Sequence, residues 1–374
     1  MNLPEDIEKK ILSELHLDNI YTRPDIYCKE IDKLRKELVT LSQVLSYECR
    51  VVKEFSDAYF CYNFPQNFMK SMILTKKLFN LYMIAIPEEI KILDIGCGDG
   101  AGMFGIFYFL HKKQPESRFQ LTGIDINDTF IKRCTSMGDW FKQKNFNIDI
   151  KLIKESAQKF IQRDKNNYDF IILSNALTEI FKSEKVPLSF IKSLFERLKK
   201  FGIIILIEPA LKTLTRRLMK LHNDIIVNRI GFILSPCLHN SKCPGLHKKE
   251  EWCHQSIKWN PPEYLKMINQ KLFRKIEYLK FSYLIISNYN FNSLPANHYP
   301  VISRLSIEKG RIKCFICTEG GIVELIRLNR ERSVINESFD HVCMGDIIEI
   351  NNPLMNKSKI WKISRDTNIK RLDF

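Results

Sequence analysis

The residues Ile92-Leu93-Asp94-Ile95-Gly96-Cys97-Gly98-Asp99-Gly100 decide the fold that we expect for this chain. They follow a short apolar run and precede a second apolar segment, 103–110. Three glycines at alternate positions allow the backbone to turn tightly and to approach a ligand closely. A helix that follows such a turn points its free N-terminal amide groups at the ligand. The stretch therefore predicts a strand, a ligand-binding loop and a helix in that order.

Short apolar runs alternate with helical patterns on both sides of this loop. The predicted strands are 91–95, 120–125, 149–153, 168–174 and 202–207. Strands that alternate with helices indicate an α/β protein with a parallel, Rossmann-like sheet. We place this core at residues 89–290, with two further strands near 232–235 and 281–287 and a cysteine-rich insertion at 236–280.

The regions on either side of this core show different patterns of apolar residues. Residues 1–88 show apolar side chains at helical spacing, most clearly in 29–47, and predict an N-terminal helical region. Residues 291–374 carry strand-like runs, with Gly320-Gly321 as a hairpin turn, and predict a small C-terminal β module.

The form D-x-G-x-G-x-G of the glycine loop resembles the first motif of S-adenosylmethionine-dependent methyltransferases. The second predicted strand ends at Asp125, where that fold binds the ribose hydroxyls. Glu155 and Ser156 follow the third strand, close to the expected adenine. The cofactor-binding residues that this resemblance implies are Asp94, Gly96, Gly98, Gly100, Asp125, Glu155, Ser156, Ser174 and Asn175.

Catalytic residues are not identifiable from the sequence. Enzymes of this fold that methylate amino groups usually follow the fourth strand with two prolines and an aromatic residue, whereas this chain has Ser174-Asn175-Ala176-Leu177. Pro236-Cys237 has the form of a cytosine-methylating nucleophile. A thiolate that is bound to a metal cannot also attack a base, so we favour a metal-ligand role.

Three cysteines, Cys237, Cys243 and Cys253, lie within one short polar stretch. Thiolates so close together suit metal coordination better than a core, although three unrelated buried thiols are the alternative. Their separations of five and nine residues differ from the C-x-x-C pairs of most zinc ribbons. An iron–sulfur cluster is therefore preferred, and zinc completed by His239, His247 or His254 stays open.

Positive charge gathers around these cysteines. The net charge is +15, and residues 182–280 hold 20 Lys and Arg against 8 Asp and Glu. A local excess of this size attracts a polyanion, and interleaved aromatic residues such as Trp252 and Trp259 suit stacking on unpaired RNA bases. A solvated lysine-rich face is the alternative. We expect RNA rather than DNA as the partner.

The stretch 231–288 is similar to the mitochondrial small-ribosomal-subunit methyltransferase-like assembly factors and their prokaryotic relatives. The residues that carry this resemblance are Gly231 to His239, Cys243-Pro244, Glu251 to His254 and Lys280 to Leu284, with Cys317-Thr318 and Gly345-Asp346 downstream. The resemblance implies a methyltransferase core, a [4Fe–4S] cluster and a role on small-subunit ribosomal RNA. It implies Cys317 as the fourth ligand. Cys314 is the competitor, and because residues three apart face opposite sides of a strand, we expect only one of the two to reach the site.

Composition limits the remaining classes. No run of about 18 apolar residues occurs, so we expect no membrane span. The acidic first residues lack a leader pattern, and 11 cysteines, an odd number, argue against a disulfide framework, so we expect a reducing, cytoplasmic location. The functional hypotheses are an RNA methyltransferase, a non-catalytic ribosome assembly factor that keeps the cofactor fold for structure, and a zinc-containing small-molecule methyltransferase.

Overall fold

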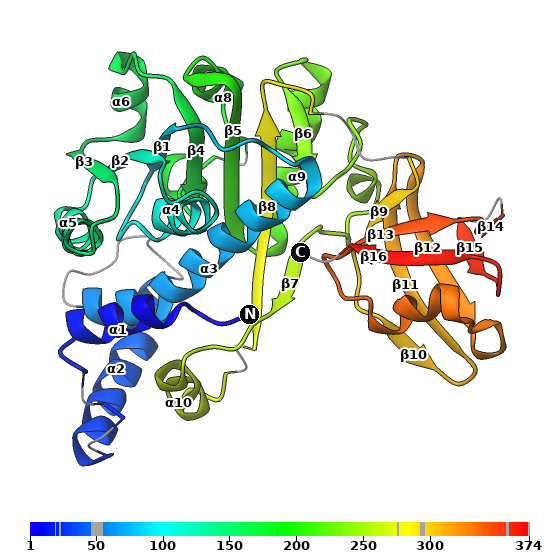
Figure 1. Ribbon diagram of the computed structural model, residues 1–374, viewed down its shortest axis with the longest axis horizontal. Helices are drawn as coiled ribbons and strands as arrows, with labels where there is room; N and C mark the ends of the chain where they lie inside the picture. The colour runs from blue at the N-terminus through cyan, green and yellow to red at the C-terminus, as the bar shows by residue number, and fades with distance from the viewer. Residues whose placement is uncertain are drawn as a thin grey trace.

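The computed structural model describes residues 1–18, 20–21, 24–45, 55–183, 185–274, 277–291, 296–356 and 359–372. Its centre is a sheet with the strand order β3-β2-β1-β4-β5-β8-β6, and β7 pairs with β8 (Figure 1). The strands are β1 (Glu89–Ile95), β2 (Arg118–Asp125), β3 (Ile148–Lys154), β4 (Tyr168–Ser174), β5 (Leu198–Pro209), β6 (Phe232–Ser235), β7 (Gln255–Lys258) and β8 (Tyr278–Ser287).

The first five strands are parallel, whereas β8 is antiparallel to β5, β6 and β7. All five strands predicted from the apolar runs are present, and four of them are longer than predicted. The strand order reverses between β1 and β4, and an open sheet of this kind binds its ligand at the carboxyl ends of the strands beside such a switch. The predicted α/β class is confirmed.

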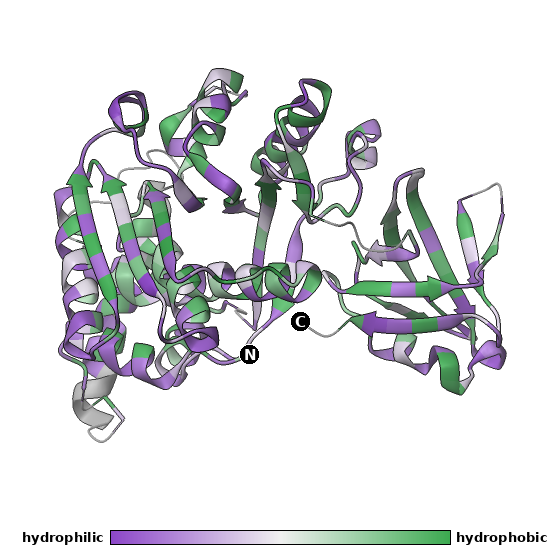
Figure 2. Ribbon diagram, turned by 45° about the horizontal axis from the view of Figure 1, so that its top comes forward, coloured by the Kyte–Doolittle hydropathy of each residue, from purple (hydrophilic) through white to green (hydrophobic). Residues whose placement is uncertain are grey.

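Alternation along the strands divides the core into two layers. Ile92 faces one layer, which holds α4 (Ala101–Lys113), α5 (Asp128–Gln143) and the N-terminal helices, and Leu93 faces the other. The second layer contains α6 (Ala157–Arg163), α7 (Leu177–Ile180), α8 (Leu188–Phe195) and α9 (Lys212–Val227). Figure 2 shows hydrophobic segments along strands of the large sheet, as strands covered on both faces require.

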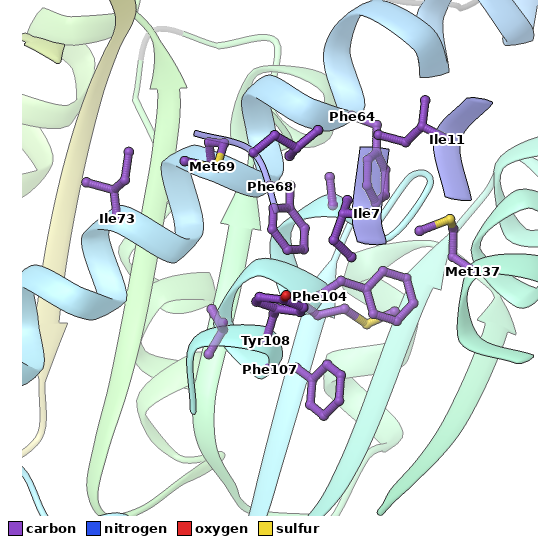
Figure 3. Packing of buried hydrophobic residues seen from close by; sticks show 14 of the residues in the cluster. Ile7, Ile11, Phe64, Phe68, Met69, Ile73, Phe104, Phe107, Tyr108 and Met137 are labelled. Atoms are coloured by element: carbon purple, nitrogen blue, oxygen red, sulfur yellow. The ribbon is translucent and has the colours of Figure 1, made fainter. Parts of the chain in front are cut away.

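The N-terminal region is helical, as predicted, with α1 (Glu5–Glu14), α2 (Pro24–Leu45) and α3 (Ser56–Tyr82). The predicted helix at 29–47 corresponds to α2, and residues 46–47 lie outside the described residues. Helix α3 lies on α4, where Phe68 meets Tyr108 with ring centroids 5.7 Å apart (Figure 3). At Gly105 a side chain would come within 2.4 Å of the Phe68 carbonyl oxygen, so this glycine lets the two helices touch.

Residues 236–277 lie between β6 and β8 and include η2 (Pro244–His247), β7 and α10 (Glu263–Lys271). Downstream, one sheet has the order β10-β11-β12-β15-β14 and another the order β16-β13-β9. Their strands are β9 (His298–Pro300), β10 (Ser306–Glu308), β11 (Arg311–Thr318), β12 (Gly321–Leu328), β13 (Ile347–Asn351), β14 (Leu354–Met355), β15 (Ile360–Ile363) and β16 (Asn368–Leu372), with the short helices η3 (Asn329–Glu331) and η4 (Val334–His341).

These downstream strands share a hydrophobic cluster of their own. The predicted turn at Gly320-Gly321 joins β11 to β12, with Thr318 paired to Gly321. The exact division into regions 1–88, 89–290 and 291–374 stays a prediction. Among the described helices, none combines the length and the apolar character needed to cross a membrane.

Candidate functional site

The glycine loop connects β1 to α4 at the carboxyl edge of the sheet. Gly96, Gly98 and Gly100 have φ values of +70°, +54° and +87°, which side chains disfavour. A side chain at Gly96 would come within 2.7 Å of the Ala176 Cβ, and one at Gly100 would enter the Phe104 ring. At Gly98, by contrast, an added Cβ would meet none of the described atoms within 4 Å. The space beside Gly98 is therefore open to a ligand.

Asp125 holds the loop from the end of β2. Its Oδ2 accepts a hydrogen bond from the Gly98 amide at 2.9 Å, and its Oδ1 accepts one from the Asn127 amide at 2.8 Å. Burial raises the pKa of this carboxyl group, and the amide hydrogen bonds oppose that shift. Asp125 therefore shapes the loop and also keeps lone pairs that can accept hydrogen bonds from a ligand.

Two further carboxyl groups are buried under the loop. Asp94, 1% exposed, accepts a hydrogen bond from the Met103 amide at 2.9 Å. Within the described residues, its Oδ1 and the Oδ2 of Asp99 are buried with no hydrogen-bond partner. Burial raises the pKa of Asp94 to about 8 and that of Asp99 to about 7. Asp99 lies inside the motif but is not among the predicted cofactor-binding residues, because burial is not visible in a sequence.

Glu155 and Ser156 follow β3. The Glu155 amide donates to the Asp125 carbonyl at 3.0 Å, so the two strand ends are adjacent. The Glu155 carboxylate, however, forms an ion pair with Arg163 at 2.8 Å. Ser156 is the N-cap residue of α6 and makes no side-chain capping hydrogen bond.

Ser174 ends β4, and Asn175 follows it. Asn175 has φ +58°, and its amide donates to the Ile207 carbonyl at 2.7 Å. Its side-chain Nδ2 donates to Asn67 Oδ1 of α3 at 3.3 Å. In the part of the chain that the structure describes, Ser174 Oγ and Asn175 Oδ1 are buried and unpaired. The structure thus brings the predicted cofactor residues to one edge of the sheet, although Glu155 pairs with an arginine.

The candidate metal residues also converge. Cys237, Cys243 and Cys253 line a cavity of about 20 Å³ together with Met219 and other residues. Burial raises the pKa of Cys237 well above its usual value, and nearby Cys317, Cys243 and Cys253 raise it further. Four thiols from the insertion and from β11 therefore lie within electrostatic reach of one another.

Cys317 and Cys314 have different surroundings. Cys317 Sγ lies 3.8 Å from His239 Nε2, on the side of the insertion. Cys314 belongs to the hydrophobic cluster of the C-terminal strands, and burial alone raises its pKa to about 12. The two cysteines face opposite sides of β11, as their spacing predicts. Among the described residues, no group of three or more His, Cys, Asp or Glu side chains is arranged to hold a single metal ion.

Cations lie near the four thiols. Lys77 of α3 lowers the pKa of Cys253, and Arg216 of α9 lowers that of Cys243, although burial dominates at both. Lys77 Nζ also donates to the Gly345 carbonyl at 2.7 Å, which ties α3 to the C-terminal strands. Arg216 donates to the carbonyl oxygens of Lys248 and Glu251 at 2.8 and 2.7 Å and so fixes the insertion to α9.

The basic residues of the insertion flank this region. A hollow of about 500 Å³ between the insertion and the C-terminal strands is lined by Lys242, His247, Lys248, Phe315 and Lys359, among others. Lys249 is exposed beside it. Lys258 lies elsewhere, in a separate hollow with Trp259 and Arg274. His254 stacks on Trp252, with ring centroids 5.7 Å apart.

Three features define a class I S-adenosylmethionine-dependent methyltransferase fold. They are the strand order with an antiparallel strand beside β5, the glycine loop after β1, and the acidic residues at the ends of β1 and β2. The family model of the mitochondrial small ribosomal subunit protein Rsm22 matches residues 53–333. This chain belongs to the Rsm22 family. No curated protein matches the sequence.

Solved methyltransferase structures also match. The plantazolicin methyltransferase BpumL, solved with S-adenosylhomocysteine, is 15% identical, with a TM-score of 0.37, over 71% of this chain and 100% of its own. Magnesium protoporphyrin IX methyltransferase from Synechocystis is 11% identical, with a TM-score of 0.35, over 68% and 97%. A methyltransferase from Pyrococcus furiosus is 10% identical, with a TM-score of 0.33, over 59% and 83%. None of these scores reaches 0.5, so the fold assignment rests on the strand order.

Proposed function

We propose that this protein is an S-adenosylmethionine-dependent methyltransferase-like protein that acts on the small ribosomal subunit and binds its RNA. The description of the family as mitochondrial small ribosomal subunit Rsm22 supports the small ribosomal subunit as the partner. The excess of positive charge in residues 182–280 supports RNA as the surface recognised. The cytoplasmic location expected from the sequence stays a prediction, and the family description points instead to mitochondria.

One observation carries the cofactor assignment: the unpaired oxygens of Asp94 and Asp99 lie under the loop whose Gly98 borders open space. Burial raises the pKa of Asp94 to about 8 and that of Asp99 to about 7, and a cationic ligand beside them would favour their ionised forms. S-adenosylmethionine carries a sulfonium and an ammonium charge, and the bound cofactor supplies an electrophilic methyl group. Asp125 would accept hydrogen bonds from the ribose hydroxyls, while the loop glycines allow close approach.

We further propose that Cys237, Cys243, Cys253 and Cys317 hold a [4Fe–4S] cluster. The donor set fits, because four thiols converge from separate segments with Lys77 and Arg216 nearby to offset thiolate charge. A single zinc ion would draw its thiolates to within about 3.8 Å of one another, given Zn–S bonds of about 2.3 Å. A cluster binds each thiolate through a different iron atom and so accepts wider spacing. It would cross-link the insertion to β11.

A second candidate function is a non-catalytic assembly factor that keeps the cofactor fold for structure. The observation that favours it is the sequence Ser174-Asn175-Ala176-Leu177 at the end of β4, which lacks the two prolines and the aromatic residue typical of amino-methylating enzymes. Mapping small-subunit RNA methylation with and without the gene separates the two. Lost subunit assembly with every methyl mark retained would select the assembly factor.

The cofactor site is tested by Gly98→Val. The new side chain would occupy the open space beside the loop, so S-adenosylhomocysteine binding measured by titration calorimetry should be lost. Gly310→Val is the matched control, because Gly310 also has a positive φ, +80°, and no described atom within 4 Å of an added Cβ. Equal binding by both variants would reject this site. Asp125→Ala should weaken binding by removing the ribose acceptor.

A further inference from the structure

Helix α3 carries a lysine into the protein interior beside the cofactor loop. Asn67, Lys70 and Ser71 lie on one face of α3, at the spacing of neighbouring turns. Ser71 Oγ donates to the Ala101 carbonyl at 3.4 Å, which places this face against the first turn of α4. The same segment of α3 touches Gly105 closely enough to exclude a side chain there. The position of Lys70 is therefore fixed by helix packing.

Lys70 lacks a counter-charge. Its side chain is 9% exposed, and Nζ donates to Asn67 Oδ1 at 3.0 Å. Among the described residues, no carboxylate pairs with it, and burial alone lowers its pKa to about 8. An ammonium group has three donors, and a buried unpaired charge destabilises the folded protein. A residue of this kind implies a ligand that supplies the missing negative charge.

The neighbours of Lys70 point to where that ligand lies. Asn67 Oδ1 accepts from Lys70 and also from Asn175 Nδ2, so the three side chains form a polar chain from α3 to the end of β4. Ala176, the next residue, meets Gly96 of the cofactor loop, where an added Cβ would lie 2.7 Å from the Ala176 Cβ. The chain of polar groups thus ends at the predicted cofactor pocket.

We infer that Lys70, positioned by Asn67, binds an oxyanion of a ligand in this pocket. The inference rests on the proposed function. The oxyanion has two possible sources, the carboxylate of the cofactor's methionine end and a phosphate of the RNA substrate. The carboxylate fits well, because the pocket then matches both charges of an amino acid, with buried aspartates for the ammonium group and Lys70 for the carboxylate.

The test compares Lys70→Met, Lys70→Arg and a control on the same helix, Lys76→Met, by titration calorimetry. The ligands are S-adenosylhomocysteine and its decarboxylated analogue. Lys70→Met should weaken S-adenosylhomocysteine binding about 10- to 100-fold, as expected for a lost hydrogen bond to a charged group, and should leave the analogue unaffected. Lys70→Arg should retain part of the affinity, and Lys76→Met all of it.

Binding of a small-subunit ribosomal RNA fragment, with S-adenosylhomocysteine saturating, tests the other source. A loss of RNA affinity in Lys70→Met with cofactor affinity intact would assign the oxyanion to a phosphate. Unchanged affinity for both ligands would overturn the inference and leave the cofactor site standing. Failure of the unmodified protein to bind S-adenosylhomocysteine would overturn both. Because Lys70→Met removes a buried unpaired charge, its melting temperature without ligand should not fall. If Lys70→Met fails to fold, Lys70→Gln is measured in the same binding assays in its place.

Discussion

The two cysteines of β11 should respond differently to replacement by serine. Cys317→Ser should lose the metal, whereas Cys314→Ser should keep it and lower the stability of the protein. Cys317→Ser removes a proposed ligand, so anaerobically purified protein should lose its broad visible absorbance, with iron and sulfide falling from near four per chain. Cys314→Ser should keep both. Cys314 is 1% exposed within the hydrophobic cluster of the C-terminal strands. A hydroxyl group there loses its water and costs about 1–3 kcal/mol if unpaired.

That cost translates into an observable shift. For a unit of 60–100 residues, about 1 kcal/mol corresponds to a melting-temperature change of about 4–8 °C. Iron and acid-labile sulfide assays, run beside thermal melts of the same samples, separate the two effects. Retained iron in Cys317→Ser together with lost iron in Cys314→Ser would refute the ligand assignment. Stoichiometric zinc without sulfide in the unmodified protein would refute the cluster.

Two further predictions concern charge. Burial raises the pKa of Asp94 to about 8, so folding favours the protonated form of this carboxyl group. The stability that the protonated form contributes is complete below the unfolded pKa near 4 and is lost as the pH rises toward 8. The ligand-free protein should therefore melt at a lower temperature at pH 8 than at pH 5, and Asp94→Asn should reduce the difference; an unchanged pH profile would contradict this. Replacing Lys242, Lys248 and Lys249 by Ala should weaken binding to small-subunit ribosomal RNA and flatten its salt dependence by about two units of slope. The matched control replaces three exposed lysines outside the insertion, Lys112, Lys113 and Lys144, and so removes the same charge. Cys243→Ser retains every lysine but should also bind this RNA poorly if the cluster fixes the insertion. Wild-type RNA affinity and salt slope in this variant would show that the cluster has no role in RNA binding.

Local pattern was sufficient for the main elements. The apolar runs predict β1 to β5 because strands covered on both faces are hydrophobic along their length. The glycines of the loop are informative because their positive φ values exclude most other residues. Strand ends were less predictable: β5 begins at Leu198, before the apolar run, since Leu198 pairs with Tyr168 ahead of a register shift, and the regular pairing with β4 starts at Ile203.

The sequence by itself determined the α/β core and the glycine loop after β1, because each depends on residue type at short spacing, whereas the cysteine ligand set stays a prediction. Only the tertiary structure decided how distant segments meet. Cys317 lies near the insertion and Cys314 in a separate core because β11 folds against both. Among the described residues, Lys70 is buried without a counter-charge, and Asp99 Oδ2 is buried without a hydrogen-bond partner. Such burial arises when helices pack on the sheet, and no local pattern of residues encodes it.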